Sequence, residues 1–188
     1  MVSPFKDVWW SMTGTSLQFW TGVLQLPNFV VVHCEEDSQQ RRYCFTVAPE
    51  HRLGVCPHCN KTSDEVHQTR TRERIQDLPI SGYAVELKVR LGQFTCEHCH
   101  KAFTPAVPFL AEGAHATERF LERTAALIRS SDVANVARFF GLAEQTLGRW
   151  YYDYVERRRT GSSETLQPVR HIGLDELSLK KNIGSSSP

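Results

Sequence analysis

The sequence predicts an α+β chain of more than one domain, in which a β-rich segment with two cysteine pairs precedes a three-helix, helix-turn-helix domain. Three observations lead to this prediction. Cys-x-x-Cys pairs stand at 56–59 and 96–99, and apolar residues alternate with charged ones over 85–91. From Thr117 onward the apolar period becomes helical. A period of two indicates a half-buried strand, and a period near 3.6 indicates an amphipathic helix.

The N-terminal part raises the question of a membrane span, because residues 8–33 carry no formal charge. A spanning helix needs about 20 predominantly apolar residues, and polar residues interrupt this stretch repeatedly. We expect a short amphipathic helix over Leu17–Leu24 instead, with no membrane partner. No export signal is present in the 188 residues, so we expect a cytoplasmic, reducing environment.

Two strands are expected after this helix, over Phe29–Cys34 and Arg42–Val47, with Glu35–Gln40 as the turn between them. Cys34 and Cys44 fall on these strands and could face each other. In a reducing compartment they are expected to be buried thiols and not a disulfide.

The four cysteines Cys56, Cys59, Cys96 and Cys99 predict a structural Zn²⁺ site. Two Cys-x-x-Cys turns supply the four soft ligands of a closed tetrahedron, whereas a catalytic zinc keeps one position open for water. A redox pair or an iron–sulfur cluster is the alternative. The 36 residues between the pairs, 60–95, suit a zinc ribbon with an elongated hairpin.

Three histidines beside these cysteines offer a different ligand set. Any of His58, His98 and His100 could replace a thiolate, but four cysteines already complete the coordination sphere. We therefore expect the histidines to face solvent.

A basic segment lies between the cysteine pairs. Arg70, Arg72 and Arg74 alternate with other residues, so a strand would place all three on one face, where they could follow a phosphate backbone. A solvated sheet face is the plain alternative. The sequence Asp77-Leu78-Pro79 is expected to break this strand, and the segment with Pro105 and Pro108 is expected to be a linker.

Three helices follow. The first has its apolar face at Phe120, Leu121, Thr124, Leu127 and Ile128. The second begins at a Ser131 or Asp132 cap, ends at Gly141, and has Val133, Val136, Ala137 and Phe140 inside. The third is expected over 144–158, with Leu147, Trp150, Tyr151 and Tyr154 inside.

The second and third helices have the spacing of a helix-turn-helix. The outward positions of the third helix include Gln145, Thr146, Arg149 and Asp153. Glutamine and arginine can bind adenine and guanine edges in a major groove, and threonine can bind an edge or a phosphate. Arg157 and Arg158 are candidate phosphate contacts. A helical hairpin without DNA contacts is the alternative, and Ala143 lacks the usual capping side chain.

A last strand is expected over 169–179, with Asp175 among apolar residues. A buried carboxylate is costly unless it binds a cation or a partner. A carboxylate on a central strand is typical of magnesium-dependent phosphoryl transfer, although an aspartate at a strand end, satisfied by backbone groups, is the plain alternative.

The order of these features resembles the ISL-type ("ISL three") transposases of bacterial insertion sequences. The resemblance covers residues 24–181 and rests on Cys-Pro-His-Cys at 56–59, the arginine-rich segment ending at 77–79, the 96/99 pair, the helix-turn-helix, and Ile-Gly-Leu-Asp-Glu at 172–176. It implies that zinc-ribbon and helix-turn-helix modules bind double-stranded DNA at terminal inverted repeats, and that the chain forms a homodimer. It also implies a ribonuclease-H-like domain in which Asp175 is the first acid of a Mg²⁺-binding DDE site.

The domain boundaries expected from all this are 1–23 for an N-terminal helical segment, 24–110 for the hairpin and zinc ribbon, 111–160 for the helix-turn-helix, 161–168 for a linker, and 169–188 for the truncated start of a catalytic domain. We expect such a chain to bind DNA without catalysing transposition alone. The alternatives are a DDE nuclease completed by another chain and a zinc-dependent protein-interaction module.

Overall fold

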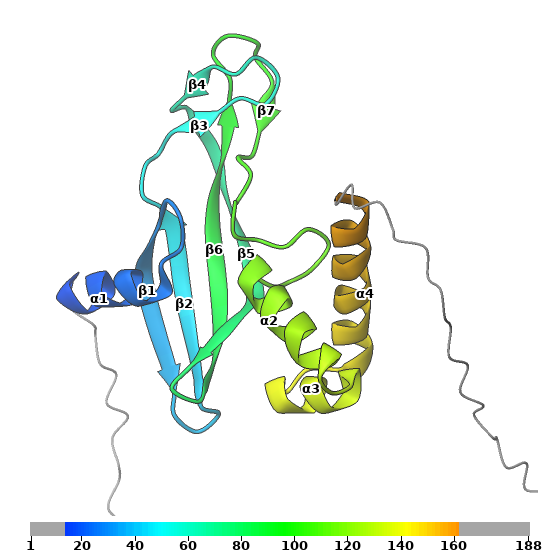
Figure 1. Ribbon diagram of the computed structural model, residues 1–188. Coiled ribbons are helices and arrows are strands. Elements are labelled where there is room, and N and C mark those ends of the chain that lie inside the picture. Colours follow the sequence, from blue (N-terminus) through cyan, green and yellow to red (C-terminus); the bar gives the residue numbers. More distant parts are fainter. Residues whose placement is uncertain (1–13, 162–188) are drawn as a thin grey trace, which may run out of the picture.

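The structure is a computed structural model, which describes residues 14–161 (Figure 1). Its elements in chain order are α1 Gly14–Leu24, β1 Phe29–Asp37, β2 Arg42–Pro49, β3 Gly54–Val55, β4 Thr62–Ser63, β5 Val66–Ile80, β6 Tyr83–Thr95, β7 Ala102–Phe103, α2 Glu118–Arg129, α3 Val133–Phe140 and α4 Glu144–Gly161. The α+β prediction, the two N-terminal strands and the three C-terminal helices are confirmed.

The main sheet has the strand order β1-β2-β6-β5, and β7 pairs with the far end of β6. β1 and β2 form an antiparallel hairpin, and so do β5 and β6. The two hairpins join through a parallel pairing of β2 with β6, which runs from Arg42↔Ala84 to Val47↔Val89. The short strands β3 and β4 form a separate hairpin beside β7 at the end of the long β5–β6 hairpin (Figure 1).

One face of the sheet forms the larger core. Phe45, Val47, Leu87 and Val89 are fully buried there, because alternate residues of β2 and β6 point to the same side. Helix α1 lies across β1 and β2 (Figure 1), and the ring of Trp20 packs 5.0 Å from that of Phe45. The expected short helix is thus confirmed within α1. Among residues 14–161 no helix is long and apolar enough to cross a membrane.

Cys34 and Cys44 lie on opposite faces of the sheet. Cys34 pairs with Phe45, whereas Cys44 pairs with Glu35. Since directly paired residues share a face, Cys34 points into the core and Cys44 points to the other side. The two thiols therefore do not face each other.

Two expectations for β5 are wrong. Asp77-Leu78-Pro79 does not break the strand, because β5 continues to Ile80. The register of its pairing with β6 shifts between Asp77 and Ile80, at the position of the proline. A second shift lies between Arg72 and Ile75, and Arg74 there has a positive φ of 56°. Such a bulge interrupts the alternation of side chains, so the three arginines do not share one face.

The segment around Pro105 and Pro108 is not a free linker. The ring of Phe109 packs edge-on against Phe29, with 5.0 Å between centroids. Leu110 forms a bridge with Thr117, and the Ala111 backbone N–H donates to the carbonyl of Ala116. This segment joins the sheet core to a second core made by the three helices.

The expected caps of α3 are confirmed, and α2 also begins at a capping residue. Thr117 caps α2, and Asp132, one of the two expected candidates, caps α3 through the N–H of Asn135 at 2.8 Å. Gly141 ends α3 in the left-handed conformation, with φ of 65°. Phe120, Leu121, Leu147 and Trp150 are buried among the three helices, as expected.

Candidate metal centre and nucleic-acid interface

Two turns of the same shape present the four cysteine sulfurs. In the first, the N–H of Asn60 donates to the carbonyl of Cys56, and the N–H of Cys56 donates to the carbonyl of Lys61. In the second, His100, Cys96 and Lys101 make the corresponding bonds at 2.8 and 3.0 Å. Asn60 and His100 both adopt positive φ, at 57° and 56°. The repeated geometry makes each Cys-x-x-Cys turn a preformed pair of ligands.

The four sulfurs meet at the open end of the β5–β6 hairpin, where β5 begins and β6 ends, opposite the turn that joins the two strands. The Sγ atoms of Cys56 and Cys99 are 3.6 Å apart, those of Cys59 and Cys96 are 3.5 Å apart, and all four lie within 4.8 Å of one another. Zn–S bonds of about 2.3 Å in a tetrahedron require sulfurs about 3.8 Å apart. The residues present therefore fit a zinc ion, and they fill its coordination sphere with thiolates.

The backbone of the second turn favours a thiolate. Hydrogen bonds from the N–H of Cys99, and next from that of His98, lower the pKa of the Cys96 thiol to about 6. Deprotonated sulfur is the form that binds metal. Burial and hydrogen bonds with the other sulfurs raise the pKa values of the Cys59 and Cys99 thiols instead, so Cys96 is the member of the cluster that the backbone favours as a thiolate.

Little else holds this end of the hairpin together. Its core consists of Cys56, Cys96 and the rings of Phe94 and Phe103, which stack 5.5 Å apart. A Cβ at Gly54 would come within 2.9 Å of the Phe103 ring, so only glycine fits under the stack. Because so small a core is weak by itself, a bound metal is expected to supply most of the local stability.

The neighbouring histidines do not join the cluster of ligand atoms. His58, His98 and His100 are all exposed. His100 has the same backbone role as Asn60 in the first turn, at the position with positive φ.

The second candidate site is the outward face of α4. Gln145 and Arg149 are exposed one turn apart on this face, opposite the buried side chains of Leu147 and Trp150. Asp153 is also exposed, whereas Thr146 is half-buried at the edge of the face. The carbonyl of Ala143 accepts hydrogen bonds from the N–H groups of Thr146 and Leu147, but alanine has no side chain that could cap the helix.

Tyr152 is a member of this face that the sequence analysis missed. It lies seven positions after Gln145, which places it on the same side of the helix, and it is 66% exposed. The helical period predicts that Tyr151 and Tyr154 belong to the core, and it gives Tyr152 no role. The spacing i, i+4, i+7 from Gln145 was the available signal.

Arg157, which is half-buried, and Arg158, which is exposed, both extend toward α2. Nη1 of Arg157 lies 3.3 Å from Oε1 of Glu118, and Nη2 of Arg158 lies 3.7 Å from Oε1 of Glu122. Both glutamates belong to α2. The guanidinium of Arg158 also lies over the ring of Tyr154. These arginines help to hold α4 against α2, so they are less available to phosphates than Arg149.

The arginines of β5 divide between the two faces of the sheet. Arg70 pairs with Leu91 and Arg72 with Val89, so both share the face of the core but extend beyond it as exposed side chains. Within the described residues, 14–161, neither takes part in an ion pair or a side-chain hydrogen bond.

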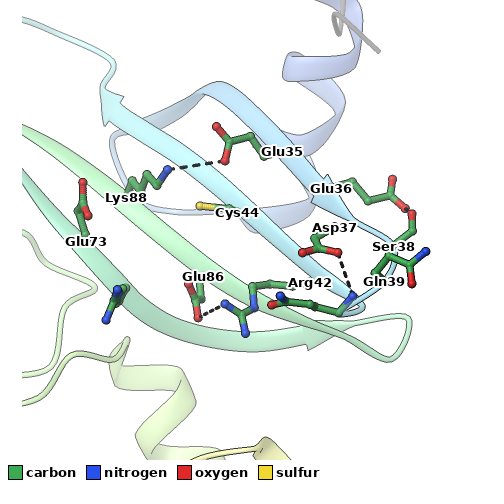
Figure 2. A pocket seen from close by; sticks show the side chains of 12 residues that line it. Glu35, Glu36, Asp37, Ser38, Gln39, Arg42, Cys44, Glu73, Glu86 and Lys88 are labelled. Carbon is green, nitrogen blue, oxygen red and sulfur yellow. Dashed lines mark hydrogen bonds and ion pairs between the residues drawn. The ribbon is translucent and has the colours of Figure 1, made fainter. Parts of the chain in front are cut away.

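Arg74 lines a hollow on the opposite face, which Figure 2 shows. Acidic side chains outnumber basic ones there, and two ion pairs cross the hollow, Lys88–Glu35 at 3.7 Å and Arg42–Glu86 at 3.2 Å. Burial raises the pKa of the Cys44 thiol on its floor. A surface rich in carboxylates repels a polyanion, so this face is unsuited to DNA.

Comparison with known proteins gives two domain matches. Residues 52–99 match the zinc-finger of transposase IS204/IS1001/IS1096/IS1165, and residues 105–155 match the helix-turn-helix domain of transposase family ISL3. The transposase for insertion sequence element IS1001 of Bordetella parapertussis is 29% identical over 141 residues, which are 75% of this chain and 34% of that protein. The chain thus spans about a third of that relative's length. No solved structure gives a significant match. The strand expected over 169–179, with Asp175, lies outside the described residues.

Proposed function

We propose that this chain, which carries the N-terminal zinc-ribbon and helix-turn-helix region of the ISL3 family of insertion-sequence transposases, binds double-stranded DNA sequence-specifically at the terminal inverted repeats of its element. The outward face of α4 carries the proposal. Gln145, Arg149 and Tyr152 are exposed there, and neither Gln145 nor Arg149 has a side-chain partner within residues 14–161.

The chemistry of these side chains suits a major groove. Arginine can donate two hydrogen bonds to a guanine, and glutamine can bind an adenine in the same bidentate way. Tyrosine supplies a hydroxyl for a phosphate or a ring for a thymine methyl group. In proteins of this type the second helix of the pair lies in the groove with its N-terminal residues on the base edges, and Gln145 and Arg149 are in the first two turns of α4.

Zinc has a structural role in this proposal. Cys56, Cys59, Cys96 and Cys99 would hold the ion, which stabilises the end of the hairpin and leaves no position open for a substrate. Dimerisation stays a prediction that rests on the family resemblance, and mass measurement of the protein–DNA complex tests it.

Fluorescence anisotropy with the end sequences of the element tests the DNA proposal. The protein should bind a labelled repeat duplex more tightly than a scrambled duplex, and its affinity should fall steeply with salt as bound counterions are released. Arg149→Ala should cost about 1–3 kcal/mol of binding free energy and relax the preference at one base pair. Arg123→Ala removes the same charge from an exposed position of α2 and should have little effect. Equal affinity for both duplexes would reject the proposal.

A further inference from the structure

The zinc ribbon and the helix-turn-helix lie at opposite ends of the β5–β6 hairpin. In Figure 1 the zinc ribbon, with β3, β4 and β7, lies at one end, whereas α3 and the beginning of α4 lie level with the β5–β6 turn at the other. β6 has 13 residues, so at about 3.3 Å per residue it is roughly 40 Å long. This length is close to one turn of B-DNA, about 34–36 Å.

The half of the hairpin nearer the ribbon carries Arg70 and Arg72, which have no side-chain partner within residues 14–161. Arg70, Arg72 and Asp77 pair with Leu91, Val89 and Val85, which alternate along β6 and so share one face. Asp77 is the point at which the helices attach to the sheet. The arginines therefore lie on the face to which the helix-turn-helix is anchored, and the acidic hollow lies on the other.

The attachment is an ion pair between a buried carboxylate and a half-buried guanidinium. The side chain of Asp77 is completely buried, and its Oδ1 atom accepts hydrogen bonds of 2.7 Å from Thr117 Oγ1 and from Arg119 Nε. Arg119 Nη2 also donates to Asp77 Oδ2. The remaining nitrogen, Nη1, donates to the carbonyl of Leu24 at the end of α1, at 2.6 Å. One guanidinium thus joins α1, β5 and α2 in fixed orientations.

Backbone contacts reinforce this junction. The N–H of Gln76 donates to the carbonyl of His115, and the N–H of Thr117 donates to the carbonyl of Gln76, both at 2.9 Å. Leu78 of β5 packs into the helical core. A flexible linker would let the helices move independently of the ribbon, but this junction holds them at one distance and angle.

We propose that the chain recognises a DNA site in two parts, one read by α4 and one contacted by Arg70, Arg72 and the ribbon about one helical turn away, and that the Asp77–Arg119 contact sets the spacing between them. This inference rests on the proposed DNA binding. Asp77 and Arg119 are positioning residues, which act on DNA only through the placement of the two modules. A rigid protein accepts only one spacing, because inserted base pairs both lengthen and rotate the second part relative to the first.

In the first experiment, the full chain is used to enrich tight-binding duplexes from a random-sequence library. The positions that the protein protects on the most enriched duplex are then mapped by hydroxyl-radical footprinting. Two protected stretches on one side of the duplex, about one turn apart, are expected. Inserting about 5 bp, half a turn, between them should lower the affinity at least about tenfold. Inserting a whole turn should cost less than this, because the second part then returns to the same side.

The second experiment repeats the insertion series with Arg119→Lys. Lysine keeps the positive charge but cannot hold both carboxylate oxygens and the Leu24 carbonyl at once. The penalty for the half-turn insertion should fall to less than about threefold, while the zinc content stays at one ion per chain. Arg123→Lys, on the same helix, is the matched control and should keep the full penalty. If Arg119→Lys fails to fold, Asp77→Asn takes its place.

The outcomes separate the two proposals. A library that yields no enriched sequence rejects sequence-specific binding and this inference with it. An enriched sequence with a single protected stretch, or with equal affinity at every spacing, leaves the proposed function standing and overturns the two-part site. A spacing penalty that Arg119→Lys and Asp77→Asn leave unchanged overturns the positioning role.

Discussion

The Sγ atoms of Cys56 and Cys99 lie 3.6 Å apart although 43 positions separate the two cysteines in the chain. Each belongs to a turn whose other cysteine completes the cluster. A metal bound between these turns closes a loop that contains the whole β5–β6 hairpin, so its removal should affect the whole ribbon.

Metal removal is the first prediction. A strong chelator should unfold the ribbon end while the sheet core around Phe45 persists, because in the described part of the chain Phe94 and Phe103 are the only large side chains buried with the cysteines. Structural zinc contributes about 10–16 kcal/mol in small zinc domains. Atomic emission should give one zinc per chain, and limited proteolysis should cut within 52–66 and 94–103, the two segments that carry the cysteines, only after chelation. Cys99→Ser should lose zinc, and Cys44→Ser, outside the cluster, should keep it.

The second prediction concerns the Cys34 thiol, whose pKa is raised from 9.0 to about 12 chiefly by burial, with a further contribution from Glu36. A raised pKa in the folded state means that this group's stabilising effect is full below pH 9.0 and is lost as the pH rises toward 12. The free energy of unfolding should therefore fall over this range, and Cys34→Ala should reduce that fall. Urea titrations at several pH values measure both. An identical pH dependence in the variant would contradict the assignment.

The third prediction concerns the ion pair between Asp77 and Arg119. Arg119→Ala should reduce the free energy of unfolding by about 3 kcal/mol, because it leaves the Asp77 carboxylate buried without its charge partner. Asp77→Asn in the same chain should recover part of this loss, since the amide carries no charge. Urea denaturation of the two single variants and the double variant gives the coupling. Additive losses would show that the two side chains act independently.

Helix α4 offers a stabilising change at Gly148. A Cβ there would meet Val133 Cγ1 at 3.6 Å, an ordinary contact, and alanine is favoured over glycine in a helix by about 0.5–1 kcal/mol. Gly148→Ala should raise the melting temperature by a few degrees. Gly54→Ala, where the added Cβ would lie 2.9 Å from the Phe103 ring, should lower it. The paired calorimetric measurement separates a general effect of alanine from the local space at each glycine.

The last prediction concerns Tyr152. If its ring or hydroxyl contacts DNA, Tyr152→Ala should weaken binding to the repeat duplex by about 1 kcal/mol or more and change the scrambled duplex less. Tyr152→Phe separates the hydroxyl from the ring. Phe139→Ala is the control for loss of an exposed aromatic residue, because Phe139 is 75% exposed on α3. This variant should bind the repeat duplex as the unchanged protein does. Unchanged affinity in Tyr152→Ala would remove this residue from the recognition face.

The sequence alone determined the elements whose causes are local. Cys-x-x-Cys spacing brings two ligands to one ion within a single turn, so Cys56, Cys59, Cys96 and Cys99 could be identified without a fold. The caps and the apolar period of 117–158 depend on residues three or four apart, and α2, α3 and α4 lie where those signals predicted.

Only the tertiary structure decided what depends on residues far apart in the chain. The parallel pairing of β2 with β6, the packing of Phe109 on Phe29, and the contact of Arg157 with Glu118 have no local signature. Asp77 shows the reason most clearly. Beside Leu78 and Pro79 its local signal is a turn, but hydrogen bonds from Thr117 and Arg119, about 40 residues later, stabilise the carboxylate inside a strand.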